Sequence, residues 1–158
     1  MAKSQPIKLL ILGYDQTKIT FLNRLIRGLI EQEIQVILAT TQPEQIEAQF
    51  QGALQTLKLV PLKNNRFIQV FRFLTLLISA LLSKRRQWLW QVVLEQPGLK
   101  QSLGMFFRYA PFCQSDFNLI YFPWNSPAIT YQKLFDLGLP IVISCRGSQI
   151  NIRPNLPG

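Results

Sequence analysis

Short apolar segments alternate with amphipathic ones along the first sixty residues. Residues 7–13 form a mostly apolar run, which is typical of a parallel strand covered on both faces. Two further short runs, 34–39 and 57–60, have the same character, and residues 43–54 read as a helix between them. The first crossover is predicted to be an amphipathic helix by apolar residues at helical spacing, namely Leu22, Leu25, Ile26, Leu29 and Ile30. Three strands alternating with two helices favour a doubly wound α/β sheet.

The last third of the chain reads as one strand-helix-strand unit. Residues 118–122 and 141–144 are the strands, and the helix between them is expected to run to about Leu137. Ser126 is predicted to be its N-cap, Pro127 its first residue and Gly138 its left-handed C-terminal glycine. Ligands of open parallel sheets bind at the carboxyl ends of strands. The loops 123–126 and 145–149 are therefore expected to share that edge.

The middle third departs from this alternation. Residues 67–82 are strongly apolar, a basic cluster follows, and a further helix is expected at 99–109. Gln69 and Arg72 interrupt the apolar run before it reaches the length of a membrane-spanning helix. The expected fold is one α/β domain over residues 1–158, a Rossmann-like three-layer domain with a mostly parallel sheet and a helical middle insertion at about 63–111.

Two interpretations of this insertion stay open. The apolar segment 67–82 and the segment after it could form an interfacial helix pair, in which Lys84, Arg85 and Arg86 lie near anionic lipid headgroups and Trp88 and Trp90 lie at the membrane boundary. Alternatively, the insertion packs on its own sheet or on a partner domain, and the basic turn lies in water. A non-enzymatic peripheral-membrane or scaffold module is the corresponding alternative function.

Composition narrows the partners and the chemistry. The formal charge is +9, from 17 Lys and Arg against 8 Asp and Glu, which suits an anionic partner. No nucleic-acid-binding motif is present, so a nucleic-acid partner is not expected. The chain has no histidine and only two cysteines, which excludes zinc fingers and histidine general bases; no metal site is predicted. A reduced, cytoplasmic setting is expected, either free or at the inner face of the membrane.

Four candidate ligand residues follow the first and fourth strands. Gly13 has no glycine-rich phosphate loop around it, so a tight turn is the simpler interpretation. Asp15 could act as a base or bind a substrate hydroxyl, or it could cap the helix. Trp124, next to Asn125 in its loop, could stack on a sugar or a base, or it could pack internally.

Another candidate group follows the last strand. Arg146, Gly147, Ser148 and Gln149 combine a guanidinium, a glycine turn and two hydrogen-bonding side chains. At the end of a buried strand, these residues could hold a phosphate or a sugar hydroxyl. The alternative is an exposed loop without a ligand.

The order of elements and two local motifs resemble the amino-terminal half of a GT-B glycosyltransferase of the retaining family 4 group. Such halves carry a strand of the type Asp-Ile-Ile-His-Ala-His-Trp and, after a helix, one of the type Pro-Val-Val-Leu-Thr-His-Gly-Ser-Asp. Here the corresponding segments are 118–124 and 140–149. Tyr121 and Pro123 stand where the family often has histidines, and Arg146 and Gln149 replace a histidine and an aspartate.

The resemblance implies a role in sugar transfer, as in polysaccharide biosynthesis. This half would bind a sugar or lipid-linked acceptor, and a nucleotide-diphosphate sugar would be the co-substrate, with no other cofactor. In that family a second, C-terminal domain binds most of the donor and carries paired glutamates, and the present chain has no counterpart of it. The expectation is therefore a truncated, N-terminal acceptor domain that is inactive alone, with its catalytic residues unassigned.

Overall fold

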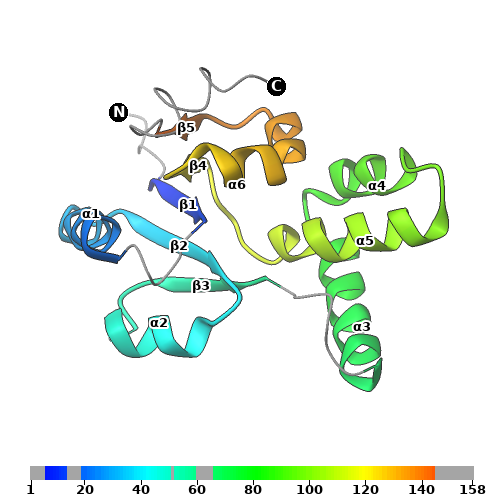
Figure 1. Ribbon diagram of the computed structural model, residues 1–158, viewed down its shortest axis with the longest axis horizontal. Helices are drawn as coiled ribbons and strands as arrows, with labels where there is room; N and C mark the ends of the chain where they lie inside the picture. The colour runs from blue at the N-terminus through cyan, green and yellow to red at the C-terminus, as the bar shows by residue number, and fades with distance from the viewer. Residues whose placement is uncertain (1–5, 14–18, 51, 60–65, 145–158) are drawn as a thin grey trace, which may run out of the picture.

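The protein is built on a five-stranded parallel sheet. The computed structural model describes residues 6–13, 19–50, 52–59 and 66–144. All strand pairs are parallel, in the order β3-β2-β1-β4-β5. The strands are β1 (Lys8–Leu12), β2 (Gln35–Thr40), β3 (Gln55–Lys58), β4 (Leu119–Phe122) and β5 (Ile141–Ile143). With helices on both sides of the sheet (Figure 1), this confirms the predicted three-layer, Rossmann-like α/β fold.

Each face of the sheet has its own helical layer. Helices α1 (Ile19–Glu31) and α2 (Pro43–Phe50) cover the face that carries Leu9 and Ile11. The opposite face, with Leu10 and Leu12, is covered by the remaining elements. These are α3 (Arg66–Leu82), α4 (Arg86–Leu94), α5 (Leu99–Tyr109), α6 (Asn125–Thr130) and the 3₁₀ helices η2 (Ala110–Cys113) and η3 (Gln132–Leu137).

The apolar runs of β1 and β2 follow from this double cover. Successive side chains of a strand point to opposite faces, so a strand covered on both faces must be apolar at every position. Residues 9–12 of β1 and 36–40 of β2 are all buried. The amphipathic crossover helix is also confirmed as α1, with Leu22 and Ile26 buried and Arg24 and Arg27 exposed.

The helical insertion lies between β3 and β4 and meets the sheet mainly through η2. This short helix contacts β3 on one side and α3, α4 and α5 on the other. Phe112 of η2 is fully buried. An aromatic group of Phe73, Trp90, Phe106 and Phe107 joins α3, α4 and α5, with ring centroids 5.2 to 6.1 Å apart. In Figure 1, α3 extends away from the sheet.

Several predicted boundaries were wrong. Helix α2 ends at Phe50, before Gly52 with its positive φ of 74°, and β3 begins at Gln55. Helix α6 begins at Asn125, so Trp124, and not Ser126, is its N-cap. After Thr130 the backbone turns at Tyr131, which has φ −112° and ψ 32°, and it continues as the 3₁₀ helix η3. Gly138 has the predicted left-handed conformation, with φ 66°.

The last strand is not the buried strand that the sequence suggested. Strand β5 pairs only with β4 in the described sheet and forms its edge. Val142 and Ile143 are 50% and 39% exposed. A β-branched apolar run therefore does not distinguish a central strand from an edge strand, because both favour the same residues.

Among the helices of the described residues, none combines the length and the apolar character needed to span a membrane.

Candidate functional site

The strand order places a switch point between β1 and β4. From β1 the chain builds outward through β2 and β3, and it then returns to the other side of β1 with β4 and β5. Crossover connections leave in opposite directions at such a point, which opens a crevice at the carboxyl edge of the sheet. Gly13 follows β1 there, and Trp124 and Asn125 follow β4. The structure thus brings together three of the predicted site residues.

Gly13 is required by a close contact across this switch point. Its φ is +86°, and a Cβ atom built on it would lie 2.3 Å from Cγ of Pro127. Only glycine permits both this backbone conformation and this approach of α6 to β1. The turn that the sequence suggests after Gly13 lies outside the described residues, and the close neighbour of Gly13 is a proline ring that the sequence pattern did not indicate.

Trp124 packs against the apolar core with part of its side chain and lies at the carboxyl edge of the sheet. It is half-buried and packs on the apolar cluster that α1 and α2 form with the sheet. Its extended backbone, with φ −146° and ψ 159°, directs the chain from β4 into α6. Asn125, the first residue of α6, is also half-buried. The indole and the amide therefore belong to a fixed strand-to-helix connection rather than to a long loop.

A hydroxyl pair joins the ends of β4 and β5. The hydroxyl oxygens of Tyr121 and Ser144 are 2.8 Å apart. Tyr121 pairs with Val142 in the sheet, and Ser144 lies two residues beyond Val142 on the same face. The Ser144 N–H also donates to the Phe122 carbonyl at 2.8 Å. Sequence reasoning missed this pair, although a tyrosine and a serine at the ends of two neighbouring parallel strands were a usable signal.

Five of the predicted site residues lie outside the described residues. They are Asp15, which follows β1, and Arg146, Gly147, Ser148 and Gln149, which follow β5. Their roles stay predictions.

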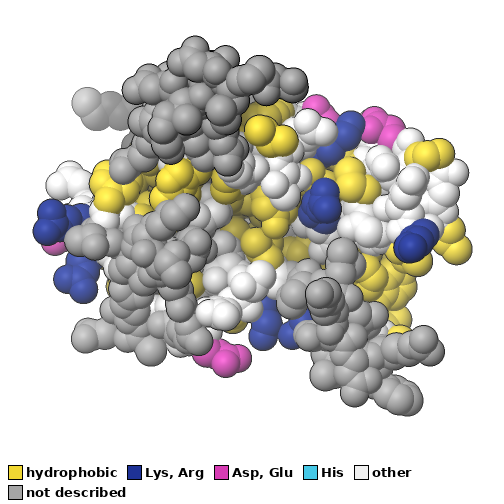
Figure 2. Space-filling view, viewed as in Figure 1, with side chains coloured by type: hydrophobic (Ala, Val, Ile, Leu, Met, Phe, Trp, Pro, Cys, Tyr) yellow, Lys and Arg dark blue, Asp and Glu magenta, His cyan; other side chains and the backbone are white. Residues whose placement is uncertain are grey.

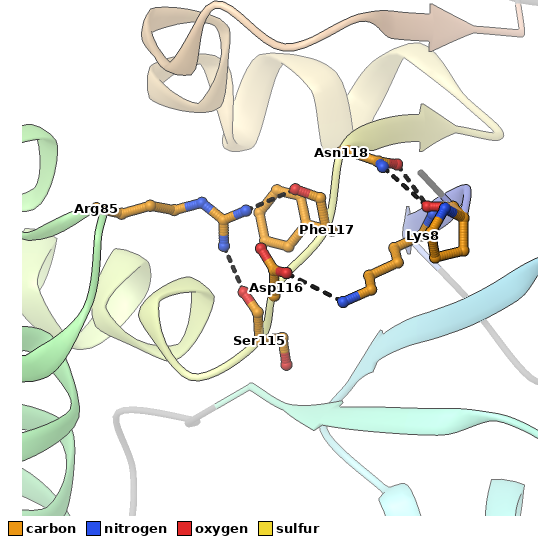
Figure 3. Close-up of polar contacts among 7 residues, drawn as sticks. Lys8, Arg85, Ser115, Asp116, Phe117 and Asn118 are labelled. Carbon is orange, nitrogen blue, oxygen red and sulfur yellow. Dashed lines mark hydrogen bonds and ion pairs between the residues drawn. The ribbon is translucent and has the colours of Figure 1, made fainter. Parts of the chain in front are cut away.

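Arg85 of the basic cluster is bound within the protein. Its guanidinium donates to the Phe112 carbonyl at 2.9 Å. The same group donates to the carbonyls of Ser115 and of Phe117, the latter at 2.7 Å (Figure 3). It also lies 3.6 Å from the centre of the Phe117 ring, at cation–π distance. Burial lowers the pKa of Arg85 from its usual value, while Asp116 acts against this shift. Arg85 therefore fastens the turn between α3 and α4 to the segment that leads into β4.

The tryptophans of α4 also face inward. Trp88 is buried, its indole N–H donates to the Lys133 carbonyl at 2.9 Å, and its ring meets Tyr109 edge-on. Trp90 is half-buried and stacks on Phe106 at 6.1 Å. These contacts favour the internal-packing alternative for Trp88 and Trp90, whereas Arg85, which that alternative placed in water, is bound within the protein. Lys84 and Arg86, in contrast, are exposed.

A second polar group fixes the amino edge of the sheet, opposite the candidate site. Asn118 accepts from the Lys8 N–H at 2.9 Å and donates to the Pro6 carbonyl at 3.0 Å (Figure 3). The Lys8 ammonium donates to the Asp116 carboxylate at 3.0 Å. This hydrogen bond holds the pKa of Asp116 below its usual value. A hollow of about 510 Å³ beside this group is lined by residues of the α3–α4 turn and of the segment 113–118.

We expect Asp116→Asn to lower the free energy of unfolding at pH 7 by less than about 1 kcal/mol, because the ion pair is exposed to solvent. A depressed carboxyl pKa stabilises the fold above the unfolded value of about 3.9, and this contribution disappears as pH falls through the lower folded value. Urea unfolding at pH 7 and at pH 2.5 measures the difference. If the free energies of unfolding of the original protein and of Asp116→Asn differ by the same amount at both pH values, the result contradicts a folded-state pKa of Asp116 lowered by Lys8.

No group of three or more His, Cys, Asp or Glu residues that could hold a metal ion occurs in the part of the chain that the structure describes. Cys113 is buried, and burial raises the pKa of its thiol. The described candidate site thus consists of an aromatic ring, an amide and two hydroxyls at the carboxyl edge. Aromatic rings and amides of this kind can stack on or hydrogen-bond to an uncharged ligand, while the two hydroxyls are bonded to each other.

Comparisons of this chain with protein-family models, with curated proteins and with solved structures found no match.

Proposed function

We propose that this chain is the acceptor-binding domain of a GT-B type glycosyltransferase, which transfers sugar from a nucleotide-diphosphate sugar. One observation carries the proposal. The parallel sheet, in the order β3-β2-β1-β4-β5, has its switch point between β1 and β4. Gly13 contacts α6 there, and Trp124 connects β4 to α6. The resemblance of residues 118–124 and 140–149 to the family motifs supports the same interpretation.

The groups at this edge suit binding and positioning rather than bond cleavage. An indole face can stack on the apolar face of a sugar ring, and the Asn125 amide can donate to and accept from its hydroxyls. Departure of a nucleotide diphosphate needs prearranged hydrogen-bond donors in a site that excludes water. In the proposal a second domain supplies these hydrogen-bonding groups, so this chain alone binds the acceptor without transferring sugar.

The first test follows the indole N–H resonances of the three tryptophans during titration. Each resonance is assigned by replacing Trp88, Trp90 or Trp124 with phenylalanine. The probes are octyl glucoside below its micelle concentration, a short-chain prenyl pyrophosphate sugar, and uridine diphosphate glucose. We expect an acceptor probe to shift the Trp124 resonance and to leave those of Trp88 and Trp90 in place, because the latter two lie in the insertion.

Binding should weaken about three- to tenfold in Trp124→Ala, since an aromatic contact contributes about 0.5 to 1.5 kcal/mol. The matched control is Trp90→Phe, which should bind as the original protein does. The proposal fails if no probe shifts Trp124, or if uridine diphosphate glucose is the only probe that does so. The latter outcome would indicate that the carboxyl edge of the sheet binds the nucleotide sugar and not the acceptor.

A further inference from the structure

Helix α3 presents an apolar face to the solvent. Seven of its side chains are exposed between positions 70 and 82, and Thr75 is the single polar one among them. The other six are Val70 (61% exposed), Phe71 (72%), Leu74 (50%), Ile78 (57%), Leu81 (50%) and Leu82 (83%). We call these six residues the α3 apolar face. At 3.6 residues per turn they lie within an arc of about 120°.

This arrangement is the reverse of an ordinary surface helix. Helix α1 has Leu22 and Ile26 in the core, with Arg24 and Arg27 outside. In α3 the polar Ser79 lies on the half-buried side, beside the buried Leu76 and Ala80. A surface helix of a soluble domain normally places its charged residues outward. A contiguous apolar face of this kind marks an interaction surface.

The α3 apolar face is not needed to hold the insertion together. Leu76 and Ala80 belong to the main core, and Phe73 packs on Phe106 and Phe107 of α5. These contacts leave the outer side of α3 pointing away from the sheet (Figure 1). In Figure 2, some hydrophobic side chains are visible where Figure 1 shows α3, and Lys and Arg side chains are visible over α5.

Several exposed cations belong to the same insertion as this face. Lys84 and Arg86, in the turn after α3 and at the start of α4, are exposed, as are Lys100 and Arg108 of α5. Glu95 is the one acidic residue in the sequence from 66 to 113, and its carboxylate is paired with Lys133 at 2.7 Å. The insertion therefore combines an apolar stripe with an excess of cations, although Lys84 also lies near Asp116.

We infer that α3 docks in the plane of an anionic lipid bilayer, with its apolar face among the acyl chains and with Lys84 and Arg86 at the headgroups. At 17 residues, α3 is too short to span a bilayer but long enough to lie on one. A second copy of the chain would bring like charges together, whereas anionic lipids neutralise them. This inference stands without the proposed glycosyltransferase function.

This membrane surface differs from the one that the sequence suggested. Trp88 and Arg85 are engaged within the protein, so that of the expected interfacial helix pair only α3 supplies the apolar contact. Lys84 and Arg86 remain as headgroup contacts. Because anionic lipids are concentrated in the cytoplasmic leaflet, the inner face of the membrane is the inferred location.

The test is co-sedimentation of the full chain with phosphatidylcholine vesicles, with or without one quarter phosphatidylglycerol. We expect binding to the anionic vesicles in low salt and at least tenfold weaker partition for Ile78→Glu. The matched control is Ile129→Glu on α6, because Ile129 is also an exposed isoleucine, at 71%. This variant should bind as the original protein does. Thermal unfolding followed by circular dichroism verifies that both variants are folded.

The charge contribution is tested with Lys84→Gln and Arg86→Gln. Each should weaken partition about fivefold, because a basic residue near an anionic surface contributes about 1 kcal/mol, and 0.5 M salt should have a similar effect. The inference is overturned if the chain binds neither kind of vesicle. It is also overturned if Ile78→Glu and Ile129→Glu weaken the partition into anionic vesicles equally. If ultracentrifugation shows a dimer that Ile78→Glu dissociates while vesicles are not bound, a second copy covers the face instead.

Discussion

Replacing Arg85 by methionine is expected to lower the free energy of unfolding by about 3 kcal/mol. Methionine keeps much of the side-chain volume but leaves the carbonyls of Phe112, Ser115 and Phe117 without their common donor. A buried carbonyl that loses its partner costs about 1 to 3 kcal/mol, and the contact with the Phe117 ring is lost as well. Urea unfolding followed by circular dichroism measures the change.

Arg86 provides the matched control for this prediction. It is the next residue in the chain and carries the same charge, but it is exposed. Arg86→Met should change the free energy of unfolding by less than about 0.5 kcal/mol. Arg85→Lys should lie between the two, because an ammonium group cannot reach all three carbonyls from one position. Equal effects of Arg85→Met and Arg86→Met would show that the hydrogen bonds of Arg85 do not hold the insertion in place.

Replacing Gly13 by alanine is expected to lower the free energy of unfolding by about 2 to 5 kcal/mol. An alanine at φ +86° is strained by about 1 to 2 kcal/mol. The new methyl group would also overlap the Pro127 ring, at 2.3 Å from Cγ, and relieving such an overlap costs about 1 to 3 kcal/mol. Thermal and urea unfolding measure the sum.

Gly138→Ala separates the two causes. Gly138 also has a positive φ, 66°, but no atom lies within 4 Å of the added Cβ position. It should therefore show the backbone strain alone, about 1 to 2 kcal/mol. In a double-mutant cycle, Pro127→Gly should recover part of the loss caused by Gly13→Ala. If Gly13→Ala and Gly138→Ala have equal effects, the contact between Gly13 and Pro127 contributes nothing to stability.

The Gly13 variant also bears on the proposed ligand site. Pro127 belongs to α6, which begins directly after Trp124. A methyl group at position 13 would have to push α6 away from the end of β1. We therefore expect Gly13→Ala to weaken ligand binding at the Trp124 indole even at temperatures where the protein is folded, whereas Gly138→Ala should not.

The sequence by itself determined the alternation of strands and helices. Apolar runs such as residues 9–12 predict doubly covered strands, and the spacing of Leu22 and Ile26 predicts an amphipathic helix, because these patterns depend on local geometry. Helix α5, predicted at 99–109, was found with those bounds. Gly138 was also predicted correctly, since its left-handed conformation is a local property. The sequence also indicated that Gly13, Trp124 and Asn125 follow the carboxyl ends of strands, whereas their meeting at one switch point depends on the strand order of the sheet.

Only the tertiary structure decided which side chains are engaged and which are free. Arg85 and Arg86 are indistinguishable in sequence, yet one binds three carbonyls from residues about thirty positions away and the other is exposed. The Gly13–Pro127 contact, the Tyr121–Ser144 pair and the exposed side of α3 likewise depend on segments distant in the chain. Apolar periodicity shows that a helix has a packing face, but the partner that covers the face is chosen by the fold.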